Sequence, residues 1–179
     1  MQNTHTHSLF GTVRRLCAVA LLTALAVVIA YLCKSLTFMQ LRITFEDIPI
    51  ILAGYLFGPI AGLCCGVCAD FLSATMFYGL GGICPLVTVG AGVVGFSAGA
   101  VSRWILRKPG TVQLSVSVTA AHVLGNMLVK SIGLGIWYSY SVPQLLLRVP
   151  QYIILGGLEL LLLCILLRSK GVQKVIREL

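Results

Sequence analysis

The sequence consists mainly of long apolar runs that are almost free of charge. A helix needs about 20 predominantly apolar residues to cross the hydrocarbon core of a bilayer, and such runs recur from residue 13 to residue 168. Hydrophobic residues make up 58% of the chain and charged residues only 10%, whereas soluble domains carry about 25% charged residues. A soluble protein of this composition would expose large apolar patches and aggregate. The chain is therefore predicted to be an all-α integral membrane protein.

Six transmembrane helices are predicted from the points at which the apolar runs are interrupted. The predicted helices cover residues 13–33, 46–57, 59–77, 85–106, 112–138 and 143–168. Pro59, Pro85 and Pro143 stand at helix starts, where the N–H that proline lacks would be unpaired anyway. The second helix is short and is not expected to span the bilayer straight. We expect one transmembrane domain (13–169) between an N-terminal cytoplasmic tail (1–12) and a basic C-terminal tail (170–179).

Basic residues predict the orientation of the helices. The net charge is +8, and most of the basic residues fall on one side of the six-helix layout. They are Arg14, Arg15, Arg103, Arg107, Lys108, Arg168, Lys170, Lys174 and Arg177. Only Lys34 and Arg42 lie in loops on the other side. Because cytoplasmic loops are enriched in Lys and Arg, both termini are expected in the cytoplasm.

Four ionisable residues lie inside the apolar runs, where each costs about 3 kcal/mol or more unless it is paired or hydrated. They are Asp70, Lys130, Arg148 and Glu159. Lys130 and Arg148 lie toward the outer ends of their helices, so they either reach the interface with their long side chains or face a cavity that takes an anionic ligand. Asp70 and Glu159 can instead pair with other helices, and for Glu159 the structural and functional interpretations carry equal weight.

Aromatic and amide residues gather at the same outer end. They are Phe38, Phe77, Tyr78, Trp137, Tyr138, Gln144 and Gln151, with Asn126 deeper. Taken singly, the aromatic residues fit the belt found at membrane interfaces. Together with Arg42, Lys130 and Arg148 they describe a site for a flat, hydrogen-bonding, anionic ligand. His122, one turn before Asn126, is interpreted as a packed polar group rather than a ligand contact.

Small residues recur at four-residue spacing, which lets helix backbones approach closely in lipid. The series are Gly54, Gly58, Gly62 and Gly66; Gly95 and Gly99; and, in the first helix, Ala20, Ala24, Ala26 and Ala30. Packing within the bundle explains most of them. A face that docks another membrane subunit is the alternative, and the alanines of the first helix are the best candidates for it.

Several functional classes leave no motif in the sequence. A Walker loop, HExxH and paired acids at catalytic spacing are absent, and the one GxSxG match, Gly95-Phe-Ser-Ala-Gly99, lies inside a predicted membrane helix. The chain is therefore not expected to be an enzyme. Cys65 and Cys68 form a lone CxxC pair without a partner cluster, so neither a metal nor another cofactor is expected. A visible inverted repeat is also missing, which disfavours a free-standing secondary transporter without excluding it.

Two segments resemble the substrate-binding S components of energy-coupling factor (ECF) vitamin transporters. Residues 42–62, from Arg42-Ile-Thr-Phe-Glu-Asp-Ile-Pro49 through Gly58-Pro59-Ile-Ala-Gly62, resemble their second and third helices, and Asp70 follows at a similar position. Residues 82–91, Gly-Ile-Cys-Pro-Leu-Val-Thr-Val-Gly-Ala, resemble the entry to their fourth helix. Arg148-Val-Pro-Gln151 is similar to the folate members in particular.

The resemblance implies a six-helix bundle in a bacterial plasma membrane that binds a vitamin tightly in an outward-facing pocket. It further implies a transmembrane coupling protein and two ABC-type ATPases as partners, and toppling of the subunit to release substrate inside. The four alanines of the first helix would contact the coupling protein. The residues expected to bind substrate are Phe38, Arg42, Tyr78, Pro85, Thr88, Asn126, Lys130, Trp137, Arg148 and Gln151.

Folate is the vitamin that the residues favour. Its pterin ring offers donors and acceptors for Gln151 and Asn126, and its carboxylates suit Arg42, Lys130 or Arg148. Another vitamin or precursor, such as riboflavin or a queuosine precursor, is the alternative within the family. A structural or assembly subunit that binds no small molecule, and a stand-alone secondary transporter, are the alternatives outside it.

Overall fold

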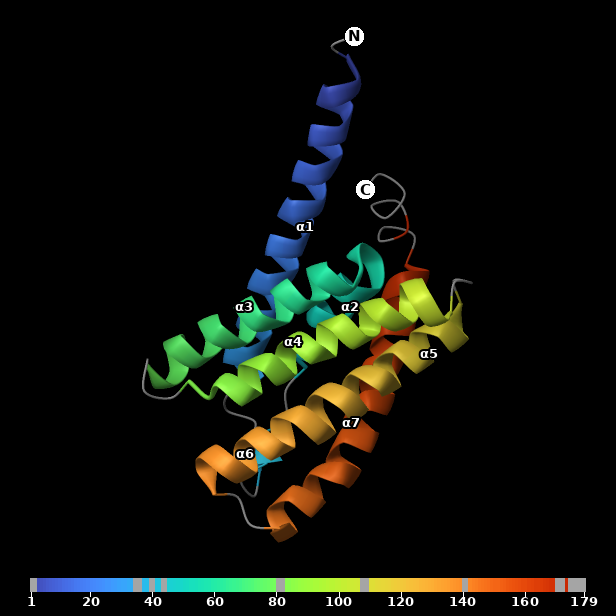
Figure 1. The fold of residues 1–179 in the computed structure, drawn as a ribbon. Coiled ribbons are helices and arrows are strands. Elements are labelled where there is room, and N and C mark those ends of the chain that lie inside the picture. Colours follow the sequence, from blue (N-terminus) through green and yellow to red (C-terminus); the bar gives the residue numbers. More distant parts are fainter. Residues whose placement is uncertain are drawn as a thin grey trace.

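The computed structural model describes residues 3–33, 37–38, 41–42, 45–79, 83–106, 110–139, 142–169 and 173. Nearly all of these residues are helical, which confirms the predicted all-α fold (Figure 1). The elements in chain order are α1 (Asn3–Cys33), β1 (Thr37–Phe38), β2 (Leu41–Arg42), α2 (Asp47–Phe57), α3 (Pro59–Tyr78), α4 (Pro85–Ala100), η2 (Val101–Ile105), α5 (Thr111–Ala120), η3 (Ala121–Lys130), α6 (Ser131–Tyr138) and α7 (Val142–Arg168). The segments η2 and η3 are π-helical and continue α4 and α5 without a break.

Within the described residues, five helical stretches are long and apolar enough to cross a membrane. They are Val13–Cys33, Pro59–Phe77, Pro85–Ile105, Thr111–Trp137 and Pro143–Arg168. The sixth apolar helix, α2, has only 11 residues, so at about 1.5 Å per residue it is about 16 Å long. That is roughly half of the hydrocarbon thickness of about 30 Å, and the expectation of a short second helix is confirmed.

The boundaries between helices follow the backbone chemistry of glycine and proline. Gly58 separates α2 from α3 with φ of 102°, a conformation that favours glycine, and Pro59 and Pro85 open α3 and α4. The guanidinium of Arg103 donates a hydrogen bond of 2.7 Å to the carbonyl oxygen of Phe57, at the end of α2. The segment between α1 and α2, predicted as a loop, contains the antiparallel pair β1–β2, with Thr37 opposite Arg42.

Glycines hold the centre of the bundle together. A Cβ atom on Gly62 of α3 would overlap the carbonyl oxygen of Gly95 on α4, and a Cβ on Gly95 would overlap that of Gly62. A Cβ on Gly54 of α2 would also overlap the carbonyl oxygen of Gly95. The three backbones are therefore in direct contact, and the packing interpretation of these glycines is confirmed. Gly66 meets Ala91 in the same way one turn further along α3.

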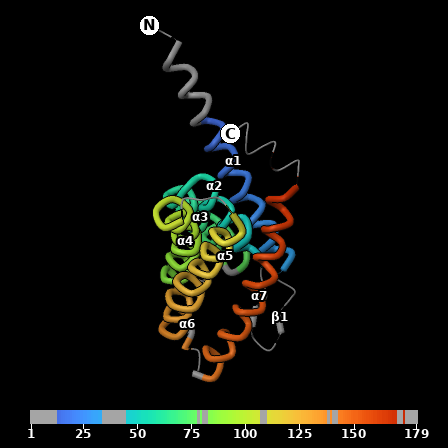
Figure 2. Tube along the Cα trace, turned by 90° about the vertical axis from the view of Figure 1, so that its right-hand side faces the viewer, coloured from blue at the N-terminus to red at the C-terminus, as the bar shows by residue number. Residues whose placement is uncertain are grey.

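The two ends of the bundle differ in which helix termini they bring together. Figures 1 and 2 show that α1 begins and α7 ends at one end of the molecule, while α6 ends and α7 begins at the other. The latter is called the α6–α7 end below. It is the end predicted to face outward.

Candidate functional site

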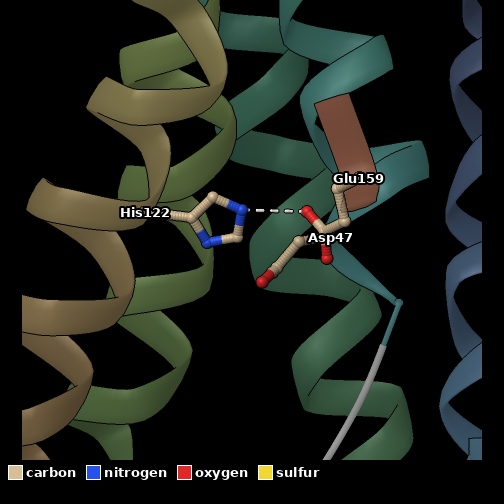
Figure 3. Close-up of side chains that lie close together, drawn as sticks. All are labelled: Asp47, His122 and Glu159. Atoms are coloured by element: carbon tan, nitrogen blue, oxygen red, sulfur yellow. Dashed lines mark hydrogen bonds and ion pairs between the residues drawn. The ribbon is translucent and has the colours of Figure 1, made fainter. Parts of the chain in front are cut away.

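Five polar side chains from three helices meet in the interior of the bundle. Asp47 comes from the first turn of α2; His122, Asn126 and Lys130 come from η3; and Glu159 comes from α7. None of the five is more than 6% exposed, and Asn126 and Glu159 are fully buried. Figure 3 shows the side chains of Asp47, His122 and Glu159 converging from different helices. These five residues are called the polar cluster.

The local structure explains why these residues point inward together. His122, Asn126 and Lys130 are spaced four residues apart, so they form one row along η3. Asp47 is the first residue of α2, where the helix dipole favours a carboxylate. This row on η3 therefore lies between Asp47 of α2 and Glu159 of α7 and connects the two acids.

Hydrogen bonds run through the whole cluster. The Lys130 ammonium lies 3.5 Å from Asp47 Oδ1, and Asn126 Nδ2 donates to Asp47 Oδ2 at 2.7 Å. Asn126 Nδ2 also lies 3.0 Å from His122 Nδ1, and His122 Nε2 lies 2.9 Å from Glu159 Oε2. An amide nitrogen can only donate, so His122 Nδ1 accepts, and the ring proton is assigned to Nε2, which donates to Glu159. His122 is neutral in this arrangement.

Two acceptor atoms of the cluster have no hydrogen-bond partner among the described residues. They are Asn126 Oδ1 and Glu159 Oε1, both completely buried. A buried polar atom without a partner costs about 1–3 kcal/mol. The cluster therefore has capacity for one or two further donors.

Arg148 and Tyr152 connect the cluster to the α6–α7 end. Arg148 is only 7% exposed; it donates a hydrogen bond of 2.7 Å to the Tyr152 hydroxyl, and its guanidinium lies 5.3 Å from the centre of the Tyr152 ring. The Tyr152 ring in turn lies 5.8 Å from that of His122. Arg148 also lines a cavity of about 200 Å³ between η3–α6 and α7, together with Met127, Ser131, Leu145, Leu146 and Val149.

A metal ion is not the natural occupant of the polar cluster. One ligand-type atom from each of Asp47, His122 and Glu159 lies within 4.8 Å of the others, which is a combination that metals use. Both oxygens of Asp47 are already engaged, however, one by Asn126 and the other by the Lys130 ammonium. A cationic side chain at that position repels a metal cation. The arrangement is that of an internal hydrogen-bonded network.

The predicted substrate-binding residues fall into four groups. The structure brings Asn126 and Lys130 into the cluster and places Arg148 beside it. Thr88 lies elsewhere, on α4, where its hydroxyl donates to Asp70 of α3 at 2.7 Å.

The remaining predicted contact residues lie nearer the surface, or their side chains fall outside the residues that the structure describes. Pro85 and Trp137 are exposed and Gln151 is partly buried. The side chains of Phe38, Arg42 and Tyr78 lie outside the described residues. Their role in binding stays a prediction.

Sequence reasoning missed part of the site. The sequence gives no reason to place Asp47 or Tyr152 in the site, and it favours a packed polar group at His122. The four-residue row formed by His122, Asn126 and Lys130 is a signal that could have identified the inward face of this helix. No comparable periodic signal marks Asp47, which lies at the end of a helix.

The alanines of the first helix divide between two environments. Ala20 and Ala24 are exposed on the surface of α1. Ala26 and Ala30 are 0% exposed, with Ala26 packed in the hydrophobic core of the bundle. In this conformation only Ala20 and Ala24 are accessible to a partner, so the predicted docking face must be narrowed to these two residues.

Comparisons with known proteins agree with the fold. A family model described as "ECF transporter, substrate-specific component" matches residues 14–167. No curated protein gives a significant sequence match. A crystal structure of FolT bound with folic acid superposes with a TM-score of 0.66 at 19% sequence identity, covering 83% of this chain and 89% of that chain. At this identity, the likeness to FolT concerns the fold.

Proposed function

Because the chain belongs to the family of ECF transporter substrate-specific components, we propose that it is the vitamin-binding subunit of an ECF-type importer, with folate as its substrate. It binds the vitamin at the α6–α7 end, which faces the outside of a bacterial plasma membrane. It then releases the vitamin to the cytoplasm when it is coupled to a transmembrane partner and two ABC-type ATPases. The chain itself performs no catalysis.

The observation that carries the proposal is the placement of two buried cations near one cavity. Arg148 lines the cavity, and Lys130 lies on η3 between Met127 and Ser131, which line it too. Both cations are more than nine-tenths buried. Cations inside a membrane protein are expensive and mark ligand or ion sites, so the pair suits a ligand that carries carboxylates.

Folate fits this arrangement better than an uncharged vitamin does. Its glutamate tail supplies carboxylates for charge-assisted hydrogen bonds to Arg148 and Lys130. Its pterin ring supplies a flat face for aromatic stacking at the α6–α7 end, where Trp137 is 57% exposed. The fold that the chain shares with FolT, which has been crystallised with folic acid, supports the same substrate.

The experiment compares two arginines at opposite ends of α7. Purified protein carrying Arg148→Gln should bind folate about 10–150-fold more weakly than wild type, since a hydrogen bond to a charged group contributes about 1.5–3 kcal/mol. The control is Arg168→Gln, which removes an exposed cation from the last turn of the same helix and should leave affinity unchanged. Equal affinity of both variants and wild type would remove the basis for the proposed site.

A further inference from the structure

Four charged side chains are buried in and beside the polar cluster, and their charges balance. Asp47 and Glu159 are acids; Lys130 and Arg148 are bases; each is 7% exposed or less. His122 is neutral in the hydrogen-bond pattern described above. An uncompensated charge in such an environment costs several kcal/mol. The described part of the chain therefore holds a neutral interior when no ligand is bound.

The surrounding helices supply little that could change this balance. Helices α4, α5 and α6, which also pack against η3, contain no Asp, Glu, Lys, Arg or His within their bounds. Two further acids, Glu46 and Asp70, are close enough to Lys130 to attract its charge. Both are only partly buried, and Asp70 is engaged with Thr88. Besides Arg148 and Glu159, α7 contributes the Tyr152 hydroxyl to this face.

An anionic ligand, whose binding is part of the proposed function, would disturb this balance of buried charges. A carboxylate that reaches Lys130 and Arg148 adds a negative charge to a set that is already neutral. The Lys130–Asp47 contact is long, at 3.5 Å, so a ligand carboxylate can take over part of the Lys130 charge. The negative charges of Asp47 and Glu159 are then only partly neutralised. The four buried side chains and the ligand carboxylate together carry a net negative charge, which favours the entry of one cation.

The structure shows where that cation can be accommodated. Glu159 Oε1 is buried and has no partner among the described residues, while Oε2 of the same carboxylate already accepts from His122. Protonation at Oε1 converts the carboxylate to a neutral carboxylic acid and breaks no hydrogen bond. His122 Nδ1 is less suitable, because protonating it would set two donors, Nδ1–H and the Asn126 amide, against each other at 3.0 Å.

We propose that binding of an anionic ligand at Lys130 and Arg148 is accompanied by uptake of one proton at the His122–Glu159 pair. Tyr152 lies close to both sites, because its ring centre is 5.8 Å from that of His122 and 5.3 Å from the Arg148 guanidinium. The proton site and the anion site are therefore linked by charge and by the chain of hydrogen bonds, without sharing a ligand atom. Chains of Asp, Glu and His inside membranes are typical of proton relays.

The test is calorimetric titration of the purified protein with folate in buffers of different ionisation enthalpy. The slope of the observed enthalpy against the buffer enthalpy gives the number of protons taken up per ligand. The wild type should take up about one proton, and its affinity should fall by up to about tenfold per pH unit as pH rises through the range of uptake. Glu159→Gln keeps the shape and the acceptor for His122 but cannot take a proton. Its uptake should be near zero and its affinity insensitive to pH.

The control variant is Asp70→Asn, which removes a membrane-embedded acid outside the cluster and should retain the wild-type uptake. Binding of folate by the wild type without any proton uptake would overturn the inference and leave the proposed function intact. Binding that disappears with a chelator and returns with a divalent metal would also overturn it, because a metal would then supply the charge. Absence of folate binding at any pH would instead contradict the proposed function. If Glu159→Gln fails to fold, the wild-type buffer and pH series decide alone.

Discussion

Replacing Lys130 with Met should destabilise the protein strongly, because it leaves Asp47 buried and charged without its cation. At 3.5 Å and an effective dielectric constant of about 20, the attraction between the two charges is about 5 kcal/mol. Breaking a buried ion pair by removing one partner typically costs about 3–5 kcal/mol. The hydrogen bond from Asn126 to Asp47 remains, so we expect the lower part of this range.

The second variant in the comparison removes both charges. In Asp47→Asn combined with Lys130→Met no buried charge is left without a partner, and the amide at position 47 can still accept from Asn126. Replacing both members of a buried pair is often nearly neutral. We therefore expect the double variant to recover most of the stability that Lys130→Met loses, with a coupling free energy of about 3 kcal/mol.

The assay is equilibrium unfolding of the ligand-free protein in mixed detergent micelles, with helix content as the signal. Ligand-free protein is used because Lys130 also belongs to the proposed binding site. The reasoning is refuted if Lys130→Met is as stable as wild type, since Asp47 would then not need its partner. It is equally refuted if the double variant is no more stable than the single one.

The remaining predictions concern packing and docking. Gly95→Ala should destabilise the protein by about 1–3 kcal/mol, because the added methyl group would overlap the Gly62 backbone on the facing helix. The control is Gly157→Ala, since a Cβ on Gly157 would have no atom within 4 Å. It should change stability by less than about 0.5 kcal/mol in the same unfolding assay. Replacing both Ala20 and Ala24 with Leu should abolish vitamin uptake by cells and leave vitamin binding by the purified subunit unchanged, because both residues are exposed on α1. Weakened vitamin binding in a folded sample would contradict a docking role for these residues. Ala26→Leu, by contrast, overfills a fully buried position and should lower thermal stability.

The positions of the helices could be predicted because they depend on local chemistry. Gly58-Pro59 and Pro85 interrupt the apolar runs at the points where α2 ends and α3 and α4 begin. The shortness of α2 follows from the same interruption. These signals act within a few residues, so they need no knowledge of tertiary packing.

The polar cluster could not be predicted with the same certainty because it depends on the rotation of three helices about their axes. Asp47, His122 and Glu159 are separated by 75 and 37 residues in sequence (122 − 47 and 159 − 122), and each one alone is compatible with a packed polar group. The rotation of α1 about its axis also decides which of its alanines are exposed and which are buried. The four-residue spacing is the same for Ala20 and Ala24 as for Ala26 and Ala30, yet only the second pair turns toward the core.

The central claim, that this subunit binds a vitamin of the folate class, is tested most directly by titrating the purified protein with folate and with riboflavin. Tryptophan fluorescence is the signal, because Trp137, one of the two tryptophans of the chain, lies on α6 at the α6–α7 end. Saturable, tight binding of folate without binding of riboflavin is the predicted result. Tight binding of riboflavin alone would contradict the assigned substrate, and a folded sample that binds neither vitamin would contradict the account of the site.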